Sequence, residues 1–310
     1  MTQPLHPFHH QSLHIISTMK RIAIFGNKSQ KTGFDKLARL IELLRTADAH
    51  FEIAVQRRYM EFLERTTGLA PDTFPRFETY EGDADLALSI GGDGSFLTTA
   101  ASVGGYETPI LGINSGHLGY LSAAELENPV EIIAEIADDD FIISPRSVIE
   151  VEVSGHHKLV RQAALNEVAI LKQDTASMIT VDTALDGSPL AKYRGDGLII
   201  STPTGSTGYN LSVGGPIMDP TASNWIISPI APHTLNMRPL VVSDSVVMQC
   251  AISSRSDHFL LSVDGKATPL PVDTRVTMRR AGYDVNVIMS RDYNFTETLR
   301  AKLLWGIDGI

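Results

Sequence analysis

Two glycine-rich segments of the sequence carry residues that could perform phosphate chemistry. The first reads Ser-Ile-Gly-Gly-Asp-Gly-Ser over residues 89–95, between an apolar run and a helical pattern. Glycines at such a turn let the main chain approach a phosphate, and the first amides of the helix attract the anion. The embedded Asp93 would repel a phosphate unless its carboxylate accepts a proton from an attacking hydroxyl or holds a divalent cation. The structural alternative is that Asp93 only caps the turn.

The second segment, residues 194–212, leads from Arg-Gly-Asp-Gly through an apolar run into a loop rich in hydroxyl side chains. These hydroxyls belong to Ser201, Thr202, Thr204, Ser206 and Thr207. A dense set of uncharged donors suits the oxygens of ribose and phosphate. The alternative is a polar turn whose hydroxyls bond to the loop's own backbone.

Neither common nucleotide fingerprint is present. The nearest approach to G-x-G-x-x-G begins at Gly92 and ends in Leu97, which argues against hydride transfer on a Rossmann domain. A P-loop ending at Lys31 is excluded because Phe25 and Gln30 occupy its two glycine positions. Lys31 remains a candidate phosphate ligand after the first strand.

The elements that must position these segments fall into two domains. Over residues 20–143, short apolar runs alternate with helical patterns, which predicts an α/β domain with a parallel sheet. Strands are expected at 22–25, 51–55, 86–90 and 110–113, and helices at 37–44, 59–65, 96–103 and 129–137. The Asp93 segment then lies at a strand's carboxyl end, where open parallel sheets bind ligands.

Residues 144–290 show period-two patterns separated by turn residues, which predicts a mainly β, sandwich-like domain. The expected strands are 149–153, 165–171, 178–185, 198–201, 245–252, 259–263, 275–280 and 285–289. Residues 291–310 return to helical spacing, and we expect this C-terminal helix to pack back on the first domain.

Residues 1–19 lack the pattern of a secretory signal and are expected to form a disordered extension, with Met19 as an alternative start of translation. The net charge of −10 argues against a nucleic-acid partner. The longest apolar runs are too short for a membrane span, so no membrane partner is expected. The single cysteine, Cys250, favours a reducing cytoplasm.

Taken together and in order, the motifs resemble those of the NAD kinase family. They are Gly-Gly-Asp-Gly-Ser at 91–95, Asn166 with Glu167, and Asp-Gly at 196–197 running into Thr-Pro-Thr-Gly-Ser-Thr-Gly-Tyr at 202–209. Gly-Gly-Pro at 214–216 and Arg-Pro-Leu at 238–240 also fit. The first motif alone also occurs in phosphofructokinase-like and lipid kinases. Two positions depart from the pattern, because many members have alanine at Gly208 and serine at Asn210.

The resemblance implies transfer of the γ-phosphoryl group of ATP, or in some members polyphosphate, to the 2′-hydroxyl of the adenosine ribose of NAD. It implies NAD and ATP as substrates, a divalent cation expected to be Mg²⁺, and a cytoplasmic homo-oligomer, either a tetramer or a dimer. Asp93 would be the general base. The expected binding residues are Gly92, Gly94, Asn166, Glu167, Ser177, Arg194, Asp196, Thr207, Gly208, Tyr209, Asn210, Leu211, Ser212 and Lys266.

Within this set, Asn166 and Glu167 could bond adenine or ribose, or could form only structural hydrogen bonds. Asp196 could orient a ribose hydroxyl or the nicotinamide amide, or pair with the neighbouring Arg194. Two other functions remain open. A kinase of another small alcohol, such as a sugar phosphate or a lipid, would share the Asp93 segment, and a non-catalytic dinucleotide sensor would share the scaffold.

Overall fold

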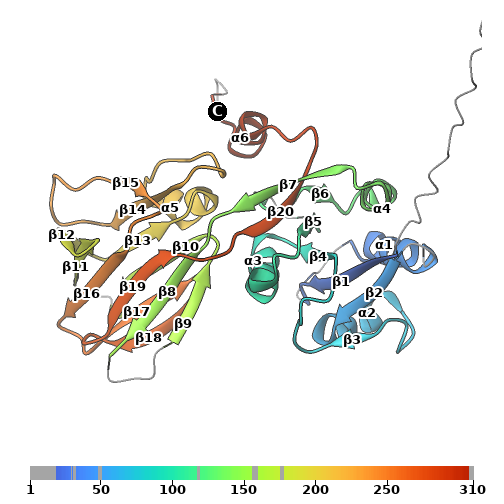
Figure 1. Cartoon of the computed structure of the whole chain (residues 1–310), viewed down its shortest axis with the longest axis horizontal. Helices are drawn as coiled ribbons and strands as arrows, with labels where there is room; N and C mark the ends of the chain where they lie inside the picture. The colour runs from blue at the N-terminus through green and yellow to red at the C-terminus, as the bar shows by residue number, and fades with distance from the viewer. Residues whose placement is uncertain are drawn as a thin grey trace, which may run out of the picture.

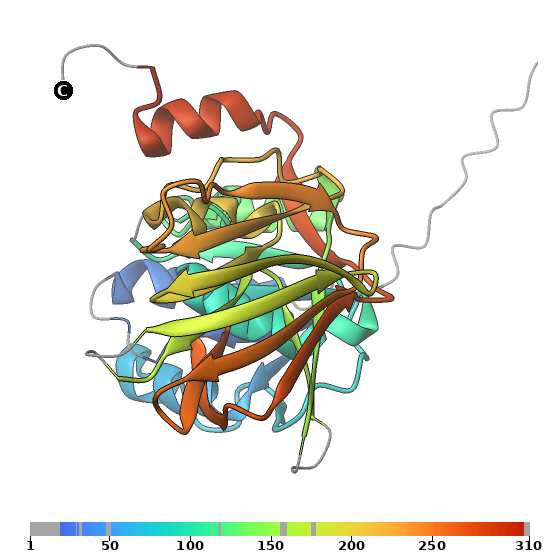
Figure 2. The same cartoon turned by 90° about the vertical axis from the view of Figure 1, so that its left-hand side faces the viewer.

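The computed structural model describes residues 19–28, 30, 33–47, 51–116, 119–155, 160–174 and 178–306. Most of the expected N-terminal extension, Lys31 and Ser177 therefore lie outside the described residues. The described chain forms two lobes, an α/β lobe and a lobe made almost entirely of strands (Figure 1). Figure 2 shows the strands of the second lobe in front of the first.

The α/β lobe is built on one sheet with the strand order β3-β2-β1-β4-β5-β20-β7, and β6 pairs with β5. The strands are β1 Lys20–Gly26, β2 Phe51–Gln56, β3 Arg76–Phe77, β4 Leu86–Gly91, β5 Ile110–Asn114, β6 Ala124–Glu125, β7 Phe141–Arg146 and β20 Val285–Ser290. The central pairs β1–β2, β1–β4 and β4–β5 are parallel, as the sequence predicts.

Helices cover this sheet because each one presents an apolar stripe to it. They are α1 Phe34–Thr46, α2 Arg57–Thr67, α3 Asp93–Val103 with the short η1 Gly104–Tyr106, and α4 Pro129–Asp138. In α1 the predicted i, i+3, i+4, i+7 set Leu37, Leu40, Ile41 and Leu44 is buried and joins the core under the sheet. The predicted alternation of strands and helices is confirmed.

The second lobe is a sandwich of two antiparallel sheets. One has the order β15-β14-β13-β10-β17-β18 and the other β12-β11-β16-β19-β8-β9. The strands are β8 Ile149–Ser154, β9 Val160–Ala164, β10 Glu167–Lys172, β11 Ile179–Leu185, β12 Ser188–Gly195, β13 Gly197–Ser201, β14 Asn224–Ile230, β15 Leu240–Ser243, β16 Met248–Ser254, β17 His258–Val263, β18 Lys266–Pro271 and β19 Arg275–Arg280. Residues from both sheets bury a common apolar core, which includes Trp225 and Phe259. The predicted sandwich is confirmed.

Several strands differ from the sequence expectation: β3, β6, β7, β9, β12, β14, β15 and β18 were not expected, and one expected strand joins the other sheet. The segment 285–289, expected among the strands of the second domain, instead pairs with β5 and β7 in the α/β sheet. Strand β14, one of the unexpected strands, contains Pro229. The structure accommodates this proline because its residue pairs only with β13, beyond the end of the β15 ladder, so no second partner needs its missing N–H.

The C-terminal helix α6, Phe295–Leu303, contacts the α/β lobe, as expected, and shares a pocket with the loop after β5 and the end of β20. Its contact is shallow, because none of its residues is buried. Lys302 supplies one anchor, since its Nζ donates to the backbone oxygen of Gly119. No helix among the described residues is long and apolar enough to cross a membrane.

Candidate active site

The candidate active site is organised around the start of α3. Strand β4 ends at Gly91, Gly92 caps the helix and Asp93 is its first residue. The φ angle of Gly91 is 149°, and a Cβ there would approach Ser95 Oγ to 2.3 Å, so the turn requires glycine. From β1 the chain continues to β2 on one side of the sheet, whereas β4 and β5 lie on the other. Open α/β sheets bind ligands at such a switch in strand order.

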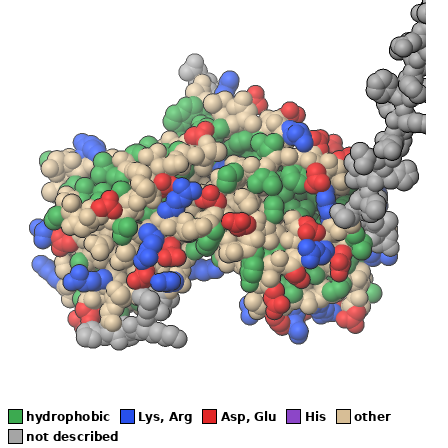
Figure 3. All heavy atoms as spheres, viewed as in Figure 1, with side chains coloured by type: hydrophobic (Ala, Val, Ile, Leu, Met, Phe, Trp, Pro, Cys, Tyr) green, Lys and Arg blue, Asp and Glu red, His purple; other side chains and the backbone are tan. Residues whose placement is uncertain are grey.

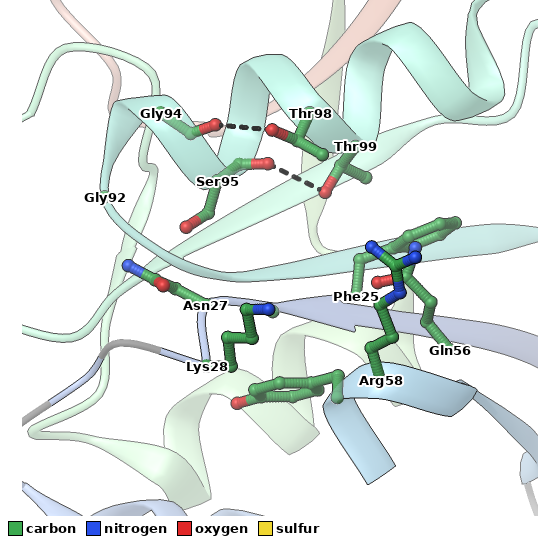
Figure 4. Close-up of a pocket in the computed structure, with 12 residues that line it drawn as sticks. Phe25, Asn27, Lys28, Gln56, Arg58, Gly92, Gly94, Ser95, Thr98 and Thr99 are labelled. Atoms are coloured by element: carbon green, nitrogen blue, oxygen red, sulfur yellow. Dashed lines mark hydrogen bonds between the residues drawn. The ribbon is translucent and has the colours of Figure 1, made fainter. Parts of the chain in front are cut away.

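A pocket of about 410 Å³ opens at this switch point, lined by the ends of β1 and β2 and by the first turns of α3. Figure 4 shows Lys28 and Arg58 extending into the space below Ser95. Two cations facing the amino end of a helix form a suitable environment for a polyanion, because side-chain charge and helix dipole act in the same direction. The pocket could therefore hold the phosphates of a nucleotide.

The carboxylate of Asp93 is held by a neighbouring loop. The backbone N–H groups of Tyr120 and Leu121 donate to its two oxygens at 3.0 and 3.1 Å. This loop follows β5, and its residues 117 and 118 lie outside the described part. Burial, and then the charge of Asp93, raises the pKa of the Tyr120 hydroxyl. The Asp93 side chain therefore does not cap its own helix but bonds to this loop.

The C-terminal helix supports the same loop from outside. The Nζ of Lys302 bonds to Gly119 and lies 5.4 Å from the ring centroid of Tyr120. Burial lowers the pKa of the Lys302 ammonium, and the charge of Asp93 acts in the opposite direction. The positive charge of Lys302, more than two hundred residues further along the sequence, thus acts on the Asp93 carboxylate.

On its other side α3 faces the second lobe across a pocket of about 240 Å³. Gly94 and Thr98 line both this pocket and the cationic one, whereas Asp264 and Lys266 reach it from the turn between β17 and β18. In Figure 3 the surface is notched along its lower edge between the two lobes. The structure thus brings the predicted Lys266 to the same helix start as Asp93.

The predicted pair Asn166 and Glu167 lies at the beginning of β10, in contact with that turn. Asp264 accepts hydrogen bonds from both of their backbone N–H groups. Within the described part of the chain, Asn166 Oδ1 and Glu167 Oε2 are buried without a hydrogen-bond partner. Burial, and then the charge of Asp264, raises the pKa of Glu167 to about 7. Buried polar atoms without partners are the atoms a ligand can satisfy.

The hydroxyl-rich loop packs next to this pair. It forms η2 Thr204–Thr207 and α5 Tyr209–Ser212. The backbone N–H of Tyr209 bonds to Glu167, and a Cβ on Gly208 would lie 2.9 Å from Glu167 Oε2. Thr207 and Leu211 are half-buried, whereas Tyr209 and Ser212 are exposed. Gly208 and Tyr209 therefore stand beside Glu167.

Most of the loop's hydroxyls serve the fold itself. Ser201 and Thr202 are fully buried and donate to backbone oxygens, Thr202 to Leu165 at 2.5 Å. Ser206 accepts from the N–H of Met218. The backbone-bonding alternative thus applies to these three, which leaves fewer hydroxyls for a ligand than the sequence suggests.

Asn210 occupies an equally internal position. It is fully buried, its Nδ2 donates to the backbone oxygens of Ser206 and Pro216, and its Oδ1 accepts from Ser228 at 2.6 Å. All of its polar groups hold the loop together. The structure therefore does not bring the Asn210 side chain to the ligand side of the loop, where the sequence placed it.

Arg194 and Asp196 lie far from Asn166 and Glu167, near the opposite end of the ladder between β10 and β13. Glu167 pairs with Ser201 at one end of the β10–β13 ladder, and Leu171 pairs with Gly197 at the other, about 13 Å along the strand. The alternative pairing of Asp196 with Arg194 was wrong: Asp196 bonds Lys172 at 2.7 Å, because β10 brings that lysine alongside.

Among the described residues, this site has no metal-binding cluster made of protein side chains alone. Within the described ranges no three His, Cys, Asp or Glu side chains come together as ligands. Mg²⁺ in phosphoryl-transfer sites is typically held by one or two carboxylates together with substrate phosphates. Asp93 fits that lesser role, because a carboxylate that accepts two backbone bonds still has free lone pairs.

Comparisons with known proteins agree with this geometry. The model of the ATP-NAD kinase N-terminal domain matches residues 22–141, and that of the C-terminal domain matches residues 165–290. The NAD kinase of Bacteroides fragilis is 42% identical over 288 residues, spanning 93% of this chain and 99% of that protein. The NAD kinase of Porphyromonas gingivalis is 41% identical over 289 residues, with the same coverage. The chain belongs to the NAD kinase family.

Solved structures with the NAD kinase fold superpose over most of the chain. Yeast NADH kinase complexed with NADH gives a TM-score of 0.84 at 20% identity, covering 94% of this chain and 89% of that one. An NAD kinase from Archaeoglobus fulgidus in complex with ATP gives 0.65 at 24% identity, covering 91% and 99%. The predicted fold class is thereby confirmed.

Sequence reasoning missed two residues that line the pocket at the switch point, Lys28 and Arg58. Each lies two residues beyond the end of a strand, β1 or β2, so the rule that ligands bind at carboxyl strand ends could have found them. The bonds from the backbone at 165–167 to Asp264 could not be predicted, because these partners lie about a hundred residues earlier in the chain.

Proposed function

We propose that this protein is an NAD kinase that transfers the γ-phosphoryl group of ATP to the 2′-hydroxyl of the adenosine ribose of NAD. One observation carries the proposal: Gly94 and Thr98, which follow Asp93 in α3, form a wall shared by two pockets. One pocket is lined by the cations of the α/β lobe, and the other by Lys266 and the turn that holds Glu167. Such a wall is where a donor and an acceptor would meet.

The donor would lie on the α/β side. Lys28 and Arg58 would bind the triphosphate, and the backbone amides at the start of α3 would face the transferred group. A bound Mg²⁺ would neutralise phosphate charge and would be held mainly by the substrate phosphates, which leaves Asp93 free to accept a proton. Catalysis of this kind depends on positioning and electrostatic stabilisation more than on covalent chemistry.

The acceptor would lie against the second lobe. Glu167 Oε2 and Asn166 Oδ1, both buried without partners among the described residues, would accept hydrogen bonds from the dinucleotide. The exposed Tyr209 ring would stack on a base or bond a phosphate, and Lys266 would add positive charge to an acidic protein. This half of the site would select the alcohol.

Asp93 would act as the general base. Its carboxylate takes the proton of the 2′-hydroxyl while that oxygen bonds to the γ-phosphorus, and the bond from phosphorus to the bridging oxygen of ADP breaks. A positioned base contributes about 10²- to 10⁴-fold to the rate. We further propose that the protein acts in the cytoplasm as a homo-oligomer.

The test is formation of NADP from NAD, ATP and Mg²⁺ by the purified protein, measured with an NADP-specific dehydrogenase. Asp93→Asn should lower kcat about 10²- to 10⁴-fold with little change in NAD affinity. Asp35→Asn is the matched control, because Asp35 is an exposed acidic residue in the first turn of α1. Absence of NADP with ATP and with polyphosphate would overturn the proposal.

The other two candidates predict different results. A kinase of a sugar phosphate or a lipid would phosphorylate that alcohol and leave NAD unchanged. A dinucleotide sensor would bind NAD without turnover, and Asp93→Asn would alter only its affinity. Neither is favoured by relatives 41–42% identical over nearly their whole length that are NAD kinases.

A further inference from the structure

The carboxylate of Asp264 organises the segment that carries Asn166 and Glu167. Its Oδ2 accepts the backbone N–H of Leu165 at 2.7 Å, and its Oδ1 accepts those of Asn166 and Glu167 at 2.9 and 3.0 Å. In return the N–H of Asp264 donates to the backbone oxygen of Glu167 at 3.1 Å. Three successive backbone amides thus bond to one half-buried carboxylate that lies about a hundred residues further along the chain.

The turn that carries this carboxylate has a backbone conformation that few residue types adopt. Asp264 and Gly265 join β17 to β18 with φ angles of 46° and 77°, both in the left-handed region. Only glycine and, less readily, asparagine or aspartate adopt that region routinely. Asparagine at 264 would therefore keep the turn while removing the charge.

The turn at Asp186 and Gly187 has the same residue types and similar φ angles, so it provides a comparison for the contacts of Asp264. Asp186 and Gly187 join β11 to β12 with φ angles of 48° and 80°, and Asp186 Oδ1 accepts one N–H, from Val247 at 2.8 Å. Asp186 holds a neighbouring strand of the sandwich, far from any predicted ligand residue. Asp264 instead holds the segment that carries Asn166 Oδ1 and Glu167 Oε2, two buried atoms without hydrogen-bond partners in the described part of the chain.

The contact is electrostatic as well as geometric. Asp264 is the titratable group that acts on Glu167, whereas Tyr209 reaches Glu167 through its backbone N–H. Burial raises the pKa of Asp264, and the three amides and Lys266 act in the opposite direction. Glu167 therefore sits beside a negative charge that its own backbone helps to stabilise.

We propose that Asp264 is a positioning residue for the dinucleotide: its carboxylate fixes the backbone at 165–167 so that the Asn166 and Glu167 side chains face the acceptor. The proposal rests on the proposed function for the identity of the acceptor. Asp264 touches no reacting atom in this scheme and acts only through its neighbours.

The test compares Asp264→Asn with the matched control Asp186→Asn. The asparagine keeps one acceptor oxygen, loses the second, and carries no charge. We expect KM for NAD to rise about 10- to 100-fold in Asp264→Asn, in keeping with the loss of a charged hydrogen-bond partner, with KM for ATP unchanged and kcat affected less. Asp186→Asn should leave all three at their original values.

A second measurement separates positioning from general loss of structure. Carbon-13 NMR of labelled glutamate carboxyls follows the titration of Glu167, whose signal is identified by its absence in Glu167→Gln. The midpoint near 7 expected for the unmodified protein should move to lower pH in Asp264→Asn and stay in place in Asp186→Asn. An unmoved midpoint, an unchanged KM for NAD, or equal effects in both variants would overturn the proposal.

The unmodified protein provides a test if Asp264→Asn does not fold. The amides of Leu165 and Asn166 precede β10, yet their bonds to Asp264 should make them exchange with deuterium as slowly as amides within the strand. Exchange at the rate of an open loop would contradict the proposal. The Glu167 titration and the amide exchange do not depend on turnover. If the protein makes no NADP, the proposed function is overturned, but these two measurements still test the positioning role of Asp264.

Discussion

Gly119 lies directly against the carboxylate of Asp93. A Cβ at position 119 would come within 2.4 Å of Asp93 Oδ1, and the next two residues donate their backbone N–H groups to the same carboxylate. Lys302 holds Gly119 from the outer side. The orientation of the proposed base is thus set by a loop and by the C-terminal helix, as well as by α3.

Gly119→Ala should therefore impair catalysis more than binding or folding. The added methyl group pushes the Asp93 carboxylate away, and displacement of a catalytic group by about 1 Å can cost about 100-fold in rate. We expect kcat to fall about 10- to 100-fold, with the KM values nearly unchanged. Steady-state kinetics and a thermal unfolding curve provide the measurement. Gly105→Ala is the control, because a Cβ there meets nothing within 4 Å. Equal loss in both variants would contradict the role of Gly119.

Arg58→Ala should weaken donor binding selectively. Arg58 faces the pocket at the switch point, so its loss removes a charged partner of the triphosphate, and we expect KM for ATP to rise about tenfold or more. KM for NAD should stay the same. The neighbouring Arg57 pairs with Glu78 on the surface, which makes Arg57→Ala a close control. A parallel rise in both KM values would show that the pocket does not belong to the donor alone.

The stability of the protein should depend on pH through Glu167. Its pKa rises from an ordinary 4.5 to about 7 on folding, so the folded chain holds this proton more tightly than the unfolded chain does. The stability that the protonated group contributes is present below 4.5 and is lost as pH rises through about 7. Glu167→Gln removes this loss. It should unfold with a free energy about 1 to 3 kcal/mol higher than the unmodified protein at pH 8, and with a much smaller difference at pH 5.

Urea unfolding without ligand at the two pH values tests this prediction, with the exposed Glu81→Gln as the control. If Glu167→Gln shows the same difference from the unmodified protein at both values, Glu167 does not carry the raised pKa.

Local pattern was enough to predict the elements that carry the site. The stripe of Leu37, Leu40, Ile41 and Leu44 predicted α1, and the apolar run before Gly91 predicted β4, because burial on one face imposes a period on the sequence. The position of Asp93 at a strand-to-helix turn followed from that alternation. The family motifs then assigned Asn166 and Glu167 to the same site.

Pairings between distant segments could not be predicted in this way. The period-two pattern of residues 285–289 shows that a strand is half-buried and leaves open which sheet it joins. Composition likewise does not distinguish a hydroxyl that bonds backbone, such as that of Thr202, from one that faces a ligand. Asn210 was misplaced for the same reason, since its partners Pro216 and Ser228 become its neighbours only in the folded loop.

The antiparallel pair β7 and β20 means that the sandwich is an insertion within the α/β lobe. The chain leaves the first sheet after Arg146 and re-enters it at Val285, and these two residues lie opposite each other in the ladder (Figure 1). Just beyond this point, the N–H of Ala281 bonds to the backbone oxygen of Val148. The acceptor-side module is therefore tethered by a two-stranded ribbon, which we expect to resist twisting better than a single linker and to keep both halves of the cleft in register.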